Sequence, residues 1–383
     1  MNMMERILRL MAERKASDIY LSAHSPVLIR INGICVPINA QVLPATAPLA
    51  LLSEVVPEAR IQELESTGEL NMAVALEGAG NYRISAMRQR GTYAVVVRHI
   101  ASVIPSFADL NLPDILKTLI MDKRGLILMV GATGAGKTTT LASMLDYRNE
   151  NASGHILTVE EPIEFTYTNK KSMVNQRDVG SDTTSLQTAL KNALRQAPDV
   201  IQIGEIRDRE TMTAAIAYAQ SGHLCVATLH ANNSYRALNR ILSFFPVEVR
   251  ATLLGDLGGA LRAIVSQRLL RTPQGARVPA LEVMLNTVLV ADLIEKGDFS
   301  AVKEAMEQSM AEGSQTFEED IARLITEERV TREEGLLHAD SPTNLLWRLQ
   351  NRAAPKQQPL EDRSLTDQVD EPTFTDITLD VKF

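Results

Sequence analysis

The segment GLILMVGATGAGKT, residues 125–138, limits the possible folds more than any other part of the chain. An apolar run ends in a glycine-rich loop, with Gly131, four further residues, and then Gly136-Lys137-Thr138. The glycines let the backbone bend so that successive N–H groups point inward at phosphate oxygens. Such a loop joins a sheet strand to a helix whose N-terminus faces the same anion.

Lys137 and Thr138 add the charged and metal-binding groups of this loop. The lysine places a positive charge at the β and γ phosphates, and the threonine hydroxyl can ligate Mg²⁺. A glycine- and alanine-rich turn before a core helix is the alternative, but the apolar strand in front of the loop disfavours it. The sequence therefore predicts that the chain binds a nucleoside triphosphate. The residues expected to contact it are Gly131, Ala132, Thr133, Gly134, Ala135, Gly136, Lys137, Thr138 and Thr139.

The composition excludes several classes of protein. A chain of 383 residues has room for two or three domains, and its net charge of −8 gives no overall attraction to nucleic acid. Only two cysteines occur, Cys35 and Cys225, far apart in sequence, which disfavours a disulfide framework or a structural zinc module and fits a reducing cytoplasm. No run of 18 apolar residues exists, so no membrane-spanning helix is predicted.

The order of expected elements predicts an α/β protein. Residues 1–104 mix helix and strand patterns: an amphipathic helix at the start, a hairpin over 25–38 with an Asn32-Gly33 turn, and a second hairpin around Gly91. From residue 116 strands alternate with helices, as in a parallel sheet with helical crossovers. The expected strands are 125–130, 155–159, 199–203 and 223–228, and the expected helices are 136–148, 184–196 and 209–220.

The remainder of the chain is expected to form a linker, a helical subdomain and a tail. Prolines punctuate residues 105–115, a predicted linker. Residues 353–383 carry seven acidic and three basic residues, which indicates an acidic flexible tail. The domain that carries the phosphate-binding loop then spans 116–352. Mostly helical segments are expected at 249–270, 288–296, 300–311, 315–327, 331–338 and 343–352.

Glu205 is the first candidate for a catalytic carboxylate. It follows the apolar strand of DVIQIGEIRD, residues 199–208, at the edge of the sheet where ligands bind in α/β folds. A carboxylate there can orient and deprotonate an attacking water. A surface glutamate that merely follows the strand is the alternative.

Three more carboxylates lie in ILTVEEPIEF, residues 156–165. Glu160, Glu161 and Glu164 beside a phosphate site repel one another unless a divalent ion is present. We expect Glu164 to act near magnesium or water, and a solvated acidic loop is the alternative.

His230 ends the apolar strand of SGHLCVATLHANNS, residues 221–234, and is expected to contact the γ-phosphate. No cysteine or third histidine lies at metal-ligand spacing from it. A structural histidine held by hydrogen bonds is the alternative reading for this position.

Together four segments, at 125–138, 156–165 (the acidic box), 199–208 and 221–234, resemble in sequence and order the secretion ATPases of type IV pili and type II secretion. The resemblance covers about residues 5–350. SDIYLSAHSPVLIRINGICVPI and LEVMLNT are similar to the retraction branch, PilT and PilU.

The resemblance implies a PAS-like α+β N-terminal domain, a RecA-like P-loop ATPase core with a helical C-terminal subdomain, and ATP and Mg²⁺ as ligands. It also implies a cytoplasmic homohexamer, peripheral to the inner membrane at the pilus base, with a membrane platform protein as partner and no nucleic acid. In such rings arginines of the N-terminal domain help to complete each site. Arg83, Arg88 and Arg98 occupy the matching region, and Arg83 and Arg98 are the expected contacts, although a solvated strand face is the alternative.

Three departures from the family pattern concern function. Where PilT carries an AIRNL segment, this chain has Ala291 at the arginine and Asp292 at the asparagine. With the acidic tail, this predicts a protein like the PilU group, which assists retraction alongside PilT. Glu161 replaces an aspartate of the acidic box, one methylene longer. The assembly ATPases are a weaker match because they carry a four-cysteine zinc module.

Two other classes of function stay open. One is an ATP-holding ring that acts mainly as a binding module on a partner ATPase, with the alternating apolar residues at 377–383 adding a strand to that partner. The other is a small-molecule kinase or DNA-packaging motor, which the absence of an acceptor motif and the acidic charge disfavour.

Overall fold

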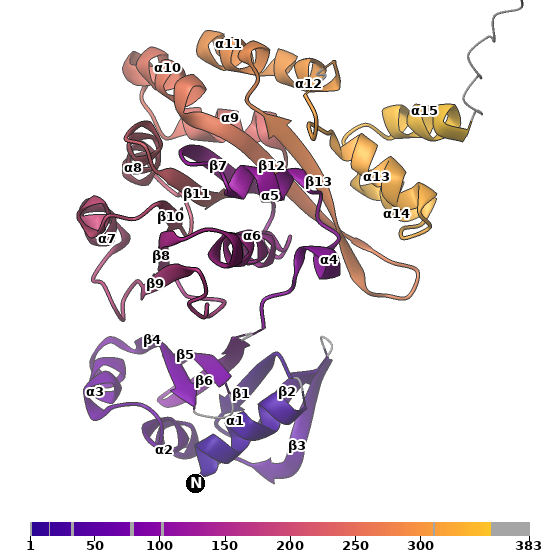
Figure 1. The fold of residues 1–383 in the computed structure, drawn as a ribbon. Coiled ribbons are helices and arrows are strands. Elements are labelled where there is room, and N and C mark those ends of the chain that lie inside the picture. Colours follow the sequence, from indigo (N-terminus) through magenta and orange to yellow (C-terminus); the bar gives the residue numbers. More distant parts are fainter. Residues whose placement is uncertain are drawn as a thin grey trace, which may run out of the picture.

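The computed structural model describes residues 2–353, except residues 15, 32–33, 77–79, 101–102 and 309–310. It shows a mixed α/β fold with two separate sheets, one in the first hundred residues and one in the rest (Figure 1). The expected acidic tail lies outside the described residues from 354 onward, as does the expected Asn32-Gly33 turn.

The first sheet is antiparallel, in the order β3-β2-β1-β6-β5-β4. Helix α1 buries Met4, Ile7, Leu8 and Met11 in the core of this sheet, so the expected amphipathic helix packs on its own domain. Both predicted hairpins are confirmed by the strand pairs β2–β3 and β5–β6. The elements are α1 (Met3–Glu13), β1 (Asp18–Ser22), β2 (Pro26–Ile31), β3 (Ile34–Val42), α2 (Ala47–Ser53), α3 (Glu58–Thr67), β4 (Glu69–Leu76), β5 (Gly80–Gln89) and β6 (Thr92–Ile100).

The second sheet has the order β13-β12-β7-β11-β10-β8-β9, and all its neighbours are parallel except β12 and β13. Helices α5 and α6 cover one face, and α7, α8, α9 and α10 cover the other (Figure 1). The elements up to α10 are α4 (Phe107–Leu110), α5 (Ile115–Ile120), β7 (Gly125–Val130), α6 (Lys137–Asn151), β8 (Gly154–Glu160), β9 (Ser172–Asp178), α7 (Leu186–Ala193), β10 (Val200–Ile203), α8 (Arg209–Gln220), β11 (Leu224–Leu229), α9 (Ser234–Ser243) and α10 (Arg250–Ala260).

The predicted strands and helices of the sheet are confirmed, but the region after α10 differs from expectation. The prediction of helix over 249–270 is wrong beyond residue 260, where β12 (Leu261–Arg271) begins and pairs with β13 (Arg277–Leu285). Residues 263–267 are buried without a break, because this strand has neighbours on both sides and packed layers on both faces. Such a strand lacks the alternation that identifies strands in a sequence.

The chain continues as five helices over the last described residues: α11 (Val288–Lys296), α12 (Ser300–Glu307), α13 (Phe317–Thr326), α14 (Arg332–His338) and α15 (Pro342–Ala353). Helix α13 packs against β13 and against α15. None of the helices in the described part of the chain combines the length and apolar composition needed to cross a bilayer.

Candidate nucleotide-binding site

The loop after β7 has the shape that the sequence predicts. β7 is buried along its whole length, and α6 begins directly at Lys137. Gly134 has φ +77° and Gly136 has φ +83°, a left-handed conformation that favours glycine. All nine residues expected to contact the nucleotide therefore lie in this loop or in the first turn of α6. The backbone N–H groups of that turn have no partner within the helix and are available to an anion.

A residue that sequence reasoning missed holds this loop in place. Gln267 of β12 is buried, its Nε2 donates to the Ala135 carbonyl at 2.8 Å, and its Oε1 accepts from Thr140 Oγ1 at 2.7 Å. A Cβ at Gly136 would lie 2.8 Å from Gln267 Nε2, and one at Gly131 would lie 2.7 Å from the Gln267 carbonyl oxygen. These glycines are thus required by the close approach of a strand about 130 residues away in sequence.

Lys137 is held against the loop. Its Nζ donates to the carbonyls of Gly131 at 2.8 Å and Ala132 at 3.0 Å. Burial lowers the pKa of this ammonium, and the nearby carboxylates Glu205 and Glu164 act in the opposite direction. The positive charge is therefore already placed over the loop in the free protein.

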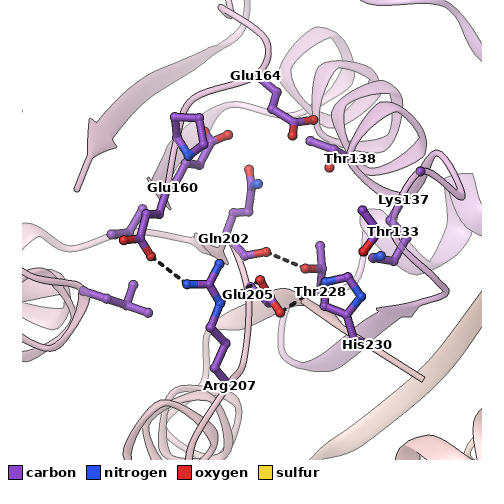
Figure 2. Close-up of a pocket in the computed structure, with 16 residues that line it drawn as sticks. Thr133, Lys137, Thr138, Glu160, Glu164, Gln202, Glu205, Arg207, Thr228 and His230 are labelled. Carbon is purple, nitrogen blue, oxygen red and sulfur yellow. Dashed lines mark hydrogen bonds and ion pairs between the residues drawn. The ribbon is translucent and has the colours of Figure 1, made fainter. Parts of the chain in front are cut away.

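The predicted catalytic residues meet Lys137 and Thr138 around one cavity of about 200 Å³ (Figure 2). Glu164, Glu205 and His230 follow strands β8, β10 and β11, whose carboxyl ends lie at one edge of the sheet. Glu164 is exposed and lies on the Thr138 side of the cavity in Figure 2. The structure thus brings together three candidates that lie between 27 and 93 residues beyond Lys137 in the sequence.

Glu205 is the centre of an ion-pair network. Its Oε2 accepts from Arg207 Nε at 2.8 Å, and its Oε1 lies 3.2 Å from His230 Nε2. Arg207 also donates to Glu161 Oε2 at 3.1 Å, and its hydrogen bond to Glu205 raises the pKa of the guanidinium. Arg207 lies in the DVIQIGEIRD box but was not singled out, because its contact with Glu161 spans 46 residues. His230 is therefore paired with a carboxylate.

Glu160 differs from the other carboxylates of the acidic box. It is 4% exposed, and it accepts from Thr158 Oγ1 at 2.7 Å and from Gln176 Nε2 at 3.2 Å. Burial raises the pKa of Glu160 to about 7, against the effect of these two hydrogen bonds. Glu160 therefore carries less negative charge near neutral pH than an exposed glutamate does.

The expected arginines lie in the first sheet, away from this cavity. Arg98 of β6 pairs with the buried Asp18 at 2.9 Å, and Arg88 of β5 donates to the Glu65 carbonyl. Arg83 of β5 is half-buried near Asp178. Within the described residues of one chain neither Arg83 nor Arg98 lines the cavity, so a contact with the site of a neighbouring chain stays a prediction.

Magnesium binding at this cavity depends on which oxygen ligands its side chains offer. In the part of the chain that the structure describes, no group of three or more histidine, cysteine or acidic side chains is arranged to hold a metal. Mg²⁺ in triphosphate sites keeps several waters and takes few protein ligands, all oxygen. The Thr138 hydroxyl and the Glu164 carboxylate, which both line the cavity, fit that donor set.

Comparison with known proteins agrees with this geometry. The family described as Type II/IV secretion system protein matches residues 1–334. The type IV pilus ATPase PilU of Pseudomonas aeruginosa is 45% identical over 342 residues, which cover 89% of this chain and 90% of that protein. The retraction ATPase PilT of the same organism is 34% identical over 338 residues, covering 88% and 98%.

Solved structures give the same result. The crystal structure of the pilus retraction motor PilT with bound ADP has a TM-score of 0.84 and 36% identity, and covers 91% of this chain and 99% of that one. The ATPase DotB of Legionella pneumophila has a TM-score of 0.76 and 26% identity, covering 87% and 94%. This chain belongs to the Type II/IV secretion system protein family, as an ATPase homologous to PilU and PilT.

Proposed function

We propose that this chain is an ATP-hydrolysing motor that assists type IV pilus retraction as an accessory to a PilT-type ATPase. The observation that carries the proposal is the single cavity where Lys137 and Thr138 meet Glu164, Glu205 and His230. The identity to the type IV pilus ATPase PilU and to the retraction ATPase PilT, over most of each chain, supports retraction as the task. The altered residues Ala291 and Asp292 support the accessory role.

The nucleotide is proposed to lie across the loop. The cavity of about 200 Å³ is smaller than the roughly 300–1,000 Å³ of sites that enclose whole small molecules, so it suits the phosphates alone. A second cavity of about 700 Å³ shares Thr133 and Gly134 with it and lies on the β12 side of the loop. Leu269 and Leu337 line that cavity together with Arg271, so it offers apolar and cationic surface to the base and ribose.

Seven groups of the first cavity and its loop then have proposed roles in hydrolysis: Lys137, the loop N–H groups, Glu205, Arg207, His230, Thr138 and Glu164. Lys137 and the loop N–H groups bind the β and γ phosphates, and Glu205 orients the attacking water and takes its proton. Arg207 and His230 hold the Glu205 carboxylate between them. Thr138 and Glu164 would hold a magnesium ion, whose charge would stabilise the negative charge on the transferring phosphoryl group.

The assembly and location of the protein are proposed from its relatives. We propose that the protein forms a cytoplasmic homohexamer, peripheral at the inner membrane, with PilT and a membrane platform protein as partners. We also propose four parts of the chain: a PAS-like domain at 1–104, a linker at 105–115, a RecA-like ATPase domain at 116–352 and a tail at 353–383. Arg83 and Arg98 are then the residues to test for contacts with the site of the next subunit.

The test begins with the purified protein and its Glu205→Ala variant. We expect the ATPase rate of the variant to fall by about 10²-fold or more, because the group that takes the proton is removed. ADP binding should persist, since Lys137 and the loop are untouched. Glu13→Ala, an exposed glutamate at the end of α1, is the matched control and should keep the wild-type rate. Equal rates for Glu205→Ala and wild type would exclude the assigned role.

The same variant tests the biological task. In cells that have the PilT-type paralogue, Glu205→Ala should reduce pilus retraction under load. In cells without the paralogue, the wild-type chain alone should not restore retraction. Full retraction by this chain alone would contradict the accessory role while leaving the ATPase assignment in place.

A further inference from the structure

The face of the second sheet that packs against α6 changes from apolar to polar near the carboxyl ends of its strands. Ile156, Val200 and Val226 are buried on this face with the apolar residues of α6. Two residues further along each strand the side chains are polar: Thr158 of β8, Gln202 of β10 and Thr228 of β11. Gln202 pairs with Thr158 on β8 and with Val226 on β11, so Thr228 lies two residues beyond the β11 position beside Gln202.

Two of these three polar side chains have partners within the protein. Thr158 Oγ1 donates to Glu160 at 2.7 Å, and Thr228 Oγ1 donates to the Gly204 carbonyl at 2.5 Å. Gln202 is 3% exposed, and its Oε1 is buried without a hydrogen-bond partner among the described residues. Of these three side chains, the Gln202 amide is thus the one whose acceptor is not used by the protein itself.

An unpaired amide in this position is costly. β10 is a central strand, and strands buried on both faces are usually runs of apolar residues. Its other residues, Val200, Ile201 and Ile203, follow that rule. Leaving a buried acceptor unpaired lowers the stability of the folded state, so each such group in a native structure needs an explanation.

The position of the side chain supplies the explanation. In Figure 2 the Gln202 amide lies in the middle of the cavity, with Glu160 on one side and Lys137 and Thr138 on the other. Glu164 and Glu205 also line this cavity. A neutral amide can contact an anionic ligand here without adding to the charge of the surrounding carboxylates, and it has both an acceptor and a donor.

We propose that Gln202 is a positioning residue for the water that attacks the γ-phosphate, an inference that rests on the proposed ATP hydrolysis. When the amide turns about its terminal side-chain bond, its Oε1 reaches the cavity and accepts a hydrogen bond from the water, and its Nε2 donates to a γ-phosphate oxygen. The water oxygen bonds to the γ-phosphorus while the bond to the β–γ bridging oxygen breaks, which releases ADP and inorganic phosphate. The water proton passes to Glu205, and Gln202 neither gains nor loses a proton.

Gln202→Met tests this role because methionine keeps the length of the side chain and removes its hydrogen bonds. We expect kcat to fall by about 10²-fold, as for other losses of alignment, with at most a few-fold rise in the KM for ATP from the lost γ-phosphate contact and an unchanged affinity for ADP. The binding of ADP with aluminium fluoride, a mimic of the transferring phosphoryl group, should weaken by a similar factor. The Tm should equal or exceed that of the wild type, because a buried unpaired acceptor is removed.

Gln267→Met is the matched control for stability. It is the same substitution at a second buried strand glutamine, but both ends of the Gln267 amide are hydrogen-bonded, so its Tm should fall. A kcat of Gln202→Met equal to wild type, or a fall in its Tm as large as that of Gln267→Met, would overturn the inference. A wild-type protein that binds ADP but does not hydrolyse ATP would instead refute the proposed function, and the inference with it.

Discussion

Replacing Gln267 of β12 by methionine should destabilise the nucleotide-binding loop, because Gln267 joins that loop to the neighbouring strand. The variant loses the hydrogen bonds to Thr140 Oγ1 and to the Ala135 carbonyl, at 2.7 and 2.8 Å. Methionine has nearly the same volume, so packing changes little. What remains is one buried hydroxyl and one carbonyl without partners, since Thr140 is 1% exposed.

The magnitude follows from these two groups. Each buried polar group left unpaired costs about 1–3 kcal/mol. The Thr140 hydroxyl can turn to the carbonyl of Gly136, four residues earlier at the N-cap of α6, which recovers part of its loss. We therefore expect the free energy of unfolding to fall by about 2–4 kcal/mol. For a folding unit of 150–250 residues, each kcal/mol corresponds to about 2–4 °C in Tm.

A double-mutant cycle makes this prediction specific. Thr140→Val removes the other partner, so the double variant Gln267→Met/Thr140→Val leaves only the Ala135 carbonyl unpaired. Calorimetry and urea denaturation of the four proteins should show that the two losses are not additive, with a coupling of about 0.5–3 kcal/mol. Additive losses, or a loss below about 1 kcal/mol for Gln267→Met, would refute the idea that this amide joins β12 to the loop.

Two further predictions concern Lys137 and a buried carboxyl. Lys137→Ala should leave the fold intact but abolish the rise in Tm that saturating ADP gives the wild type, and a retained rise would contradict its role at the phosphates. Burial raises the pKa of the Glu282 carboxyl above its ordinary value of 4.5. As pH rises past 4.5, the folded state therefore keeps a proton that the unfolded state has lost. The free energy of unfolding falls as pH rises through this range. Glu282→Gln keeps an oxygen to accept from Ser234 and Ser266 and should flatten this slope in pH-dependent denaturation; an unchanged slope would assign it to other groups.

The loop and the strands on one side of it could be predicted because their signals are local. The apolar runs of β7, β10 and β11 are bounded by polar or glycine residues, and the order of residues in the loop is itself diagnostic. Since the carboxyl ends of neighbouring parallel strands meet at one edge, placing Glu205 and His230 near Lys137 required only the fold class.

The other side of the loop could not be predicted in the same way. The sequence of β12 predicts a helix because its buried residues do not alternate with exposed ones. The contact between Gln267 and Thr140 could therefore not be predicted either. β9 was missed because it is an edge strand whose sequence, SMVNQRD, is largely polar. The unpaired state of Gln202 depends on what its neighbours bond to, which no spacing in the sequence encodes.

Strand β12, which contacts the nucleotide-binding loop through Gln267, also contacts the C-terminal helices. Arg268, next to Gln267 on β12, pairs with Asp340 at 2.5 Å and donates to the His338 carbonyl at the end of α14. The loop and α14 are thus attached to adjacent residues of one strand, and α13 packs on its neighbour β13. A partner that docks on these helices and shifts β12 should change the affinity of the protein for nucleotide. Thermodynamic linkage then requires nucleotide to change the affinity for that partner by the same factor. Titrating either ligand in the presence of the other therefore measures one shared coupling free energy.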